Sequence, residues 1–220
     1  MPTLRLCLAG PMQSWGTRSR FTERDTDIEP SKSGVLGLLC AAMGVSREDW
    51  AHLEPLARLR MGVRVDQAGE RRYDYHTAQE PDPGKVRSVW DTSVTRRFYL
   101  ADSVFLVGLE GDNRRLLESA GNALRNPHWP LYLGRKSFVP ARPVCLDPAV
   151  VDLDLLSTLK ACPFLGRGEE PKAYRMVLES QRPEGSMRMD QPVSSFAQRH
   201  FGTRYVTTSM FAREVDRVPV

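Results

Sequence analysis

The fold is decided by the stretch SGVLGLLCAAMG, residues 33–44. Ser33 is a suitable N-cap, and Gly44 stands where glycine commonly ends a helix, so the stretch predicts an α-helix between them. The helix is apolar on nearly all sides, which is typical of a helix buried among other elements. We therefore expect a buried helix in the first quarter of the chain.

Strands are expected on both sides of this helix. Apolar residues alternate with other residues at 4–8 and at 59–65, and such alternation predicts β-strands. Further strands are expected at 72–77 and at 103–109, and a short helix at 47–56.

A second long helix follows the strand at 103–109, with Asp112 as its expected N-cap and Asn126-Pro127 as its end. Its apolar face repeats at helical spacing. That face consists of Leu116, Leu117, Ala120, Ala123 and Leu124.

The order of elements predicts an α+β fold. Strand, helix, strand, an exposed excursion at 80–95, strand and helix form the βαββαβ ferredoxin-like plan once one more strand is added. We expect this domain to cover residues 1–145. Residues 147–170 are acidic and loop-like, and alternating residues after them indicate a smaller β-rich part at 146–220.

Composition narrows the class of protein. The chain has 220 residues, 41% of them hydrophobic, and a net charge of +4, which suits a polyanionic partner without requiring one. None of its four cysteines lies at metal-ligand spacing from another cysteine or from a histidine. We therefore expect neither a metal nor a cofactor. No secretory signal opens the chain, and the longest apolar run, at 35–45, is too short for a bilayer. A cytoplasmic protein without a membrane partner is expected.

No common hydrolase motif is present. Ser31-Lys32-Ser33-Gly34 is similar to a phosphate loop, but Thr26 and Ser31 stand where a Walker loop needs glycines. A lysine and a serine before a helix N-terminus can still hold a phosphate through free backbone N–H groups. An ordinary N-cap is the alternative explanation.

Tyr75-His76 is the best catalytic candidate. A histidine can act as a base and a tyrosine as an acid in metal-independent RNA cleavage, and Arg71 and Arg72 lie nearby in the sequence. The alternative, which we favour, is that both residues end a strand and stack or form hydrogen bonds.

Three segments combine aromatic and basic residues as RNA-binding loops do. Residues 13–21 contain Trp15 and Arg18, although four acidic residues nearby cancel the four basic ones. Residues 125–146 have no acidic residue and place two cations directly after Gly134. The third segment, the excursion, carries Lys85, Arg87, Trp90, Arg96 and Arg97.

These pieces in this order resemble the CasD family of the type I-E CRISPR Cascade complex, a branch of the RAMP superfamily. The matching strings are LCLAGPMQSWG (6–16), SKSGVLGLL (31–39), DYHT (74–77), YLADS (99–103) and YLGRKS (132–137). The resemblance is dense from about residue 4 to 140 and weak beyond, so it implies no site residue in 145–220.

The resemblance implies a ferredoxin-like (RRM-like) domain with a projecting β-hairpin thumb at about 78–98. It implies a non-catalytic subunit that clamps the 5′ handle of crRNA. Such a subunit contacts the adjacent backbone subunit and the large PAM-recognising subunit, and through them, indirectly, target DNA. In a related subtype the equivalent protein cuts precursor RNA, so a metal-independent endoribonuclease is the alternative.

Residue types and resemblance together predict one composite RNA clamp. Its expected members are Gln13, Trp15, Arg18, Arg20, Lys32, Ser33, Gly34, Tyr75, His76, Arg96, Arg97, Gly134, Arg135 and Lys136.

Overall fold

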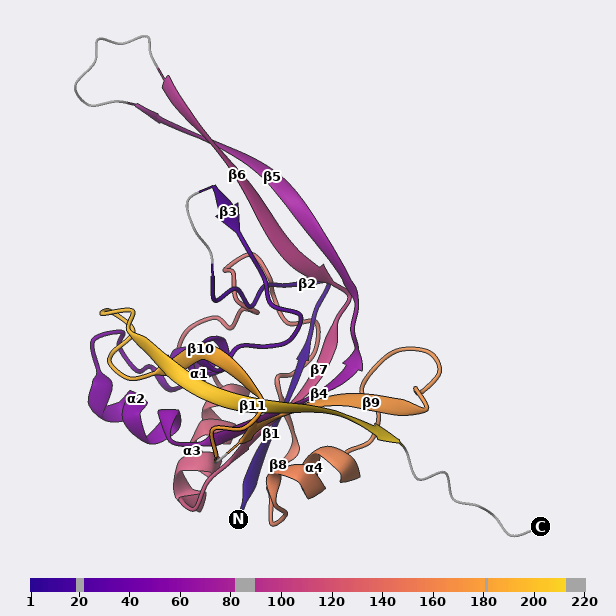
Figure 1. Ribbon diagram of the computed structural model, residues 1–220. Helices are drawn as coiled ribbons and strands as arrows, with labels where there is room; N and C mark the ends of the chain where they lie inside the picture. Colours follow the sequence, from indigo (N-terminus) through magenta and orange to yellow (C-terminus); the bar gives the residue numbers. More distant parts are fainter. Residues whose placement is uncertain (19–21, 82–89, 181, 213–220) are drawn as a thin grey trace.

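The computed structural model describes residues 1–18, 22–81, 90–180 and 182–212, and only the backbone of 78–81 and 90–93. A seven-stranded antiparallel sheet forms its centre (Figure 1). Along the sheet the strands are β10 (Ser186–Pro192), β11 (Phe201–Ala212), β9 (Ala173–Ser180), β4 (Arg60–Gln67), β7 (Val104–Glu110), β1 (Thr3–Ala9) and β8 (Cys145–Val151). The predicted mixture of helices and antiparallel strands is confirmed.

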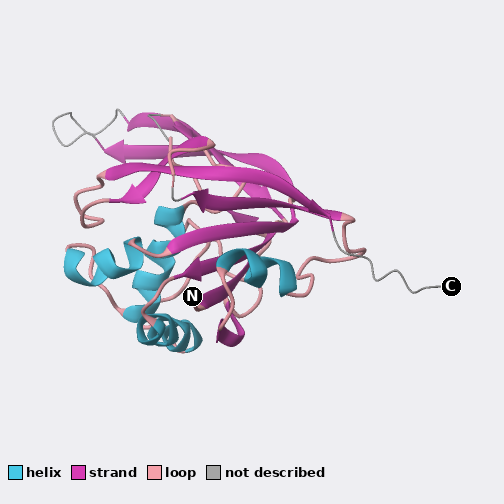
Figure 2. Cartoon of the chain, turned by 60° about the horizontal axis from the view of Figure 1, so that its bottom comes forward, coloured by secondary structure: helices cyan, strands magenta, loops and turns pink. Residues whose placement is uncertain are grey.

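Helices cover both faces of this sheet. Residues from α1 and α3 share the larger core with β1, while Leu155 and Leu159 of α4 pack into a smaller core on the opposite face. The helices are α1 (Lys32–Met43), α2 (Trp50–Ala57), α3 (Arg114–Arg125) and α4 (Leu155–Ala161), and Figure 2 shows them against the strands.

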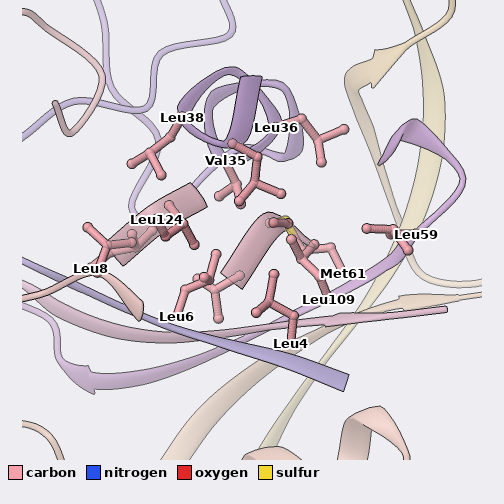
Figure 3. Close-up of a cluster of buried hydrophobic side chains, with 14 of the residues drawn as sticks. Leu4, Leu6, Leu8, Val35, Leu36, Leu38, Leu59, Met61, Leu109 and Leu124 are labelled. Carbon is pink, nitrogen blue, oxygen red and sulfur yellow. The ribbon is translucent and has the colours of Figure 1, made fainter. Parts of the chain in front are cut away.

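The larger core explains why the predicted stretch 33–44 is so apolar. Leu4, Leu6 and Leu8 project from β1 toward Val35 and Leu36 of α1, and all five side chains are fully buried (Figure 3). Burial of an aliphatic side chain contributes roughly 1.5–3 kcal/mol to stability. The four cysteines are also buried and free, and no helix among the described residues is long and apolar enough to cross a membrane.

A second, smaller sheet rises above the first. It consists of β2 (Met12–Gln13), β3 (Glu23–Arg24), β5 (Glu70–Pro81) and β6 (Trp90–Ala101). The described ends of the predicted excursion, 80–81 and 90–95, belong to a hairpin of β5 and β6, which projects from the body of the molecule (Figure 1). Its connecting residues 82–89 lie outside the described residues, so Lys85 and Arg87 are not placed.

Two predicted helix starts are wrong by one or two residues. Ser31, not Ser33, caps α1 by accepting a hydrogen bond from the Gly34 N–H at 3.3 Å. Asn113, not Asp112, caps α3. Each observed cap has a non-helical backbone, and its side chain accepts a hydrogen bond from an N–H of the first turn. Ser33 already lies inside the helix.

The stretch at 147–170, expected to be a loop, contains most of β8 and all of α4. Strands on both sides of residue 145 belong to one sheet, because β9 pairs with β4. This pairing covers the edge that β4 would otherwise expose to other chains.

Candidate nucleic-acid interface

A groove of about 1260 Å³ runs along one side of α1. Three of the predicted clamp segments line it, at residues 14–16, 33–34 and 134–136, with Arg135 outside the lining. Residues of α1 and the segments 45–48, 129–132 and 196–201 also line it. We call this cavity the α1 groove. The chain therefore brings together segments that lie far apart in the sequence.

Gln13 lies behind the groove and holds Trp15, a nearly buried ring, in its wall. The Gln13 side chain donates hydrogen bonds to the carbonyls of Leu8 and Ser103 at 3.1 and 2.8 Å, and its oxygen accepts one from the Trp15 indole at 3.1 Å. Gln13 is fully buried, and Trp15 is only 1% exposed. This corrects the prediction that Trp15 stacks on a base and Gln13 contacts RNA, because neither offers a free face.

Lys32 is also buried, at 1% exposure, which corrects its predicted role as a phosphate ligand. Its ammonium donates to both carboxylate oxygens of Glu179 at 2.9 and 3.0 Å. Asp190 accepts the Lys32 backbone N–H at 2.7 Å, so a carboxylate already occupies the helix N-terminus. Burial lowers the pKa of Lys32, and the carboxylate of Glu179 opposes this shift.

Gly134 brings the 134–136 turn against the wall of the groove. Its φ is +91°, and a Cβ built there would lie 1.7 Å from the Ser14 carbonyl oxygen. Only glycine tolerates both conditions. The neighbouring Ser14 N–H donates to the Leu133 carbonyl at 3.1 Å, so the two segments are joined directly.

Arg135 fastens the turn to the second sheet. It is half-buried, and its guanidinium donates to the carbonyls of Phe98 at 2.8 Å and Arg24 at 3.3 Å. Burial and the nearby Arg97 lower the pKa of Arg135, although a guanidinium stays charged at neutral pH. Arg135 therefore has a structural role besides the contact with RNA that was predicted for it.

Within the described part of the chain, the lining cations of the α1 groove without an ion pair are Arg47, Lys136 and Arg199, all exposed. Among the described lining residues Glu48 alone is acidic, and it accepts a hydrogen bond from the Ser46 hydroxyl. Lys136 and the half-exposed Ser33 and Gly34 were predicted. Arg199 was missed because only the fold brings it beside α1, and Arg47, which follows α1 closely in the sequence, was missed because the helix expected at 47–56 included it.

Four predicted clamp residues lie on the hairpin and do not line the α1 groove. Tyr75 pairs across the strands with Arg96, and His76 with Thr95. Successive side chains of a strand point to opposite faces, so Tyr75 and His76 diverge. His76 lies 2.7 Å from Asp74, and Arg97 donates to the Thr95 hydroxyl at 3.1 Å.

Arg96 belongs to the aromatic face of the hairpin. Its guanidinium lies 6.0 Å from the centre of the Tyr73 ring, and Tyr73 lies 5.8 Å from Phe98. Tyr73 and Tyr75 are both 59% exposed. Cations interleaved with exposed rings are typical of surfaces that bind single-stranded nucleic acid.

The loop between β2 and α1 explains why the acidic residues near Trp15 do not form a free negative surface. Glu29 is buried and accepts hydrogen bonds from Arg175 at 2.9 Å and Arg188 at 2.5 Å. Asp25 pairs with Arg71 at 2.6 Å. Arg18 is exposed beside this loop, whereas Arg20 lies outside the described residues.

Asp27 in the same loop gives a pH-dependent prediction. Burial raises its pKa above the ordinary value, against the Thr17 hydroxyl that donates to it at 2.8 Å. The folded chain therefore binds this proton more tightly than the unfolded chain, and stability is lost as the pH rises through the folded pKa. We expect Asp27→Asn to raise Tm at pH 7 and to bring no gain at pH 3. A lower Tm for Asp27→Asn at pH 7 would contradict this.

Comparison with known proteins gives the family of the chain. The family model described as "CRISPR-associated protein (Cas_Cas5)" matches residues 3–207. The chain is 35% identical, over 157 residues, to "CRISPR system Cascade subunit CasD" of Escherichia coli (strain K12), which covers 65% of this chain and 69% of that protein.

Two solved structures are similar over nearly the whole chain. One, described as "Crystal structure of Cas protein", is 43% identical with a TM-score of 0.78, covering 96% of both chains. The other, described as "CRISPR RNA-guided surveillance complex", is 33% identical with a TM-score of 0.77, covering 96% of this chain and 90% of its own. By its sequence and its fold, the chain belongs to the CRISPR-associated Cas5 family and, as the five motifs predicted, to its CasD branch.

Proposed function

We propose that this chain is a non-catalytic subunit of a CRISPR surveillance complex and that it holds the 5′ handle of crRNA in the α1 groove. The observation that carries the proposal is the meeting of segments 14–16, 33–34 and 134–136 in one groove with three free cations. A single-stranded RNA would be held there chiefly by its phosphates. The names of the related CasD and of the related complex support the assignment.

The fold of the proposed subunit is ferredoxin-like. The neighbouring strands β8, β1, β7 and β4 support this, because α1 connects β1 to β4 and α3 connects β7 to β8. In this proposal the core domain extends to the end of β8, slightly past the predicted limit at 145, and strands β9 to β11 widen its sheet. The hairpin of β5 and β6 is the thumb.

The proposed partners besides crRNA are the adjacent backbone subunit and the large PAM-recognising subunit, and through them, indirectly, target DNA. Exposed methionines on the outer strands support a protein contact, since methionine adapts to varied surfaces. Met187, Met189 and Met210 are 58%, 55% and 67% exposed.

The non-catalytic role is supported by the divergence of Tyr75 and His76 on β5. An acid and a base must reach the same phosphate to cut RNA together. Purified protein incubated with repeat RNA in EDTA is expected to leave the RNA intact. A specific cut that disappears in His76→Ala would contradict the proposal and favour the endoribonuclease.

The proposal predicts a salt-dependent loss of binding in Lys136→Ala. Each phosphate contact to a single strand contributes about 0.7 to the slope of log K against log salt, so the variant should bind handle RNA more weakly with a slope reduced by about that amount. Titration at several salt concentrations measures both.

Arg115→Ala is the matched control for that titration. Arg115 is exposed on α3 and does not line the α1 groove, so its loss changes the net charge equally. Equal losses of RNA affinity in the two variants would show only a general charge effect and would contradict the binding of RNA in the α1 groove.

A further inference from the structure

The half of the α1 groove farthest from the predicted clamp has aromatic walls. Trp129 and Tyr132 line it from the segment after α3, Phe196 from the segment before β11, and Phe201 from the first position of β11. Trp129 is 43% exposed, and the other three rings are partly exposed. Phe196 and Phe201 support each other, with ring centres 6.5 Å apart.

Backbone hydrogen bonds attach both walls to the carboxyl end of α1. The N–H groups of His128 and Trp129 donate to the carbonyls of Ala42 and Ala41 at 2.9 and 3.1 Å. The Ala197 N–H donates to the Arg47 carbonyl at 2.9 Å. The backbone at Trp129 and beside Phe196 is therefore attached to the end of α1 and to the turn that follows it.

The floor of this half is kept empty by Gly37. Glycine within a helix destabilises it relative to alanine. A Cβ at Gly37 would nevertheless meet no atom within 4 Å, so packing inside the chain does not require the glycine. A Cβ at Gly34, by contrast, would lie 2.9 Å from the Trp15 ring. The space over Gly37 is open toward the groove.

Charge indicates what fills that space. Arg47 and Arg199 border the aromatic half and Lys136 the other half, while Glu48 is the single acidic residue of the described lining. Single-stranded RNA presents flat bases that stack on aromatic rings and phosphates that attract such cations. An apolar peptide would need the rings but not the cations.

We propose that unstacked bases of the handle RNA lie over Gly37 and stack on the rings of Trp129, Tyr132, Phe196 and Phe201, while Arg47 and Arg199 bind the adjoining phosphates. The inference rests on the proposed function and extends it to the carboxyl-terminal segment 194–201. The RNA path then follows the whole length of α1 from Lys136 to Arg199.

Gly37→Leu tests this inference with little risk to the fold. The added side chain enters open space, so Tm should not fall, but it occupies the place of the bases. We expect the full chain to bind a synthetic single-stranded RNA carrying the handle about tenfold more weakly, the loss typical of one stacked base. Ser119→Leu, at an exposed position of α3, is the matched control and should bind like the unmodified chain.

Phe201→Ala and Trp129→Ala give an independent reading. In RNAs that carry the fluorescent base 2-aminopurine at one handle position each, the unmodified chain should quench the fluorescence at one or two of these positions. The two variants should restore the fluorescence at the same positions. Unchanged affinity of Gly37→Leu would overturn the inference while a salt-dependent loss in Lys136→Ala upheld the proposed function.

Two further results would also be decisive. If the unmodified chain did not bind the RNA, both proposals would fall. If Gly37→Leu kept its RNA affinity but no longer assembled with the other subunits of the complex, the α1 groove would bind a peptide segment of another subunit, and the inference would be wrong.

Discussion

Replacing Arg64 by methionine is expected to lower the free energy of unfolding by about 3–5 kcal/mol, the usual cost of removing one partner from a buried ion pair. Arg64 is 1% exposed and sits on β4, on the face covered by α4. Its guanidinium pairs with both carboxylate oxygens of Asp66 at 2.7 and 2.8 Å. The variant would leave the buried Asp66 carboxylate without its cation.

The same guanidinium also closes the carboxyl end of α4. It donates to the carbonyls of Leu159, Cys162 and Pro163 at 2.6, 2.5 and 2.8 Å. Helix ends leave carbonyls without partners inside the helix, and buried carbonyls without donors are costly. Methionine matches the length of the arginine stem but donates no hydrogen bond, so the loss is electrostatic rather than steric.

Urea denaturation of Arg64→Met and of Arg114→Met would measure the effect. Arg114 forms an exposed pair with Glu118 at 2.8 Å, and such pairs contribute less than about 1 kcal/mol. A loss below about 1 kcal/mol in Arg64→Met would contradict the prediction. Affinity for RNA under folding conditions should not change, because Arg64 does not line the α1 groove.

The buried elements could be predicted from the sequence because their periodicity is local. Apolar residues recur at strand spacing in β1 and β4 and at helix spacing in α3, while β7 and α1 are nearly continuous apolar runs, as expected of elements buried on most sides. Helix α4 was missed because it has only seven residues and lies among acidic ones. The available signal was Asp154, which caps α4 by accepting a hydrogen bond from the Ser157 N–H.

The site was harder to predict because buried and exposed lysines have similar neighbours in the sequence. Lys32 and Lys136 each precede a serine in a short polar stretch, yet one is buried and the other exposed. The difference arises from Glu179 and Asp190, 147 and 158 residues away in the chain. Nothing in the sequence around Lys32 indicates that two carboxylates of the widened sheet enclose it.

Gly134→Ala is expected to have the second large effect, a loss of about 2–4 kcal/mol in the free energy of unfolding together with weaker RNA binding. The alanine methyl would lie 1.7 Å from the Ser14 oxygen, so the 134–136 turn must move away from the wall of the groove. Lys136 moves with it. Denaturation and RNA titration on the same preparation would measure both losses.

Gly168→Ala separates backbone strain from the close approach. Gly168 has a φ of +75°, and a Cβ there would meet no atom within 4 Å. Gly168→Ala should lower the free energy of unfolding only by the cost of the left-handed backbone conformation, about 1–2 kcal/mol, and should leave the RNA affinity unchanged. If Gly134→Ala lost no more stability than Gly168→Ala and kept its affinity, the contact with Ser14 would not position Lys136, and the clamp would have to depend on the other walls of the α1 groove.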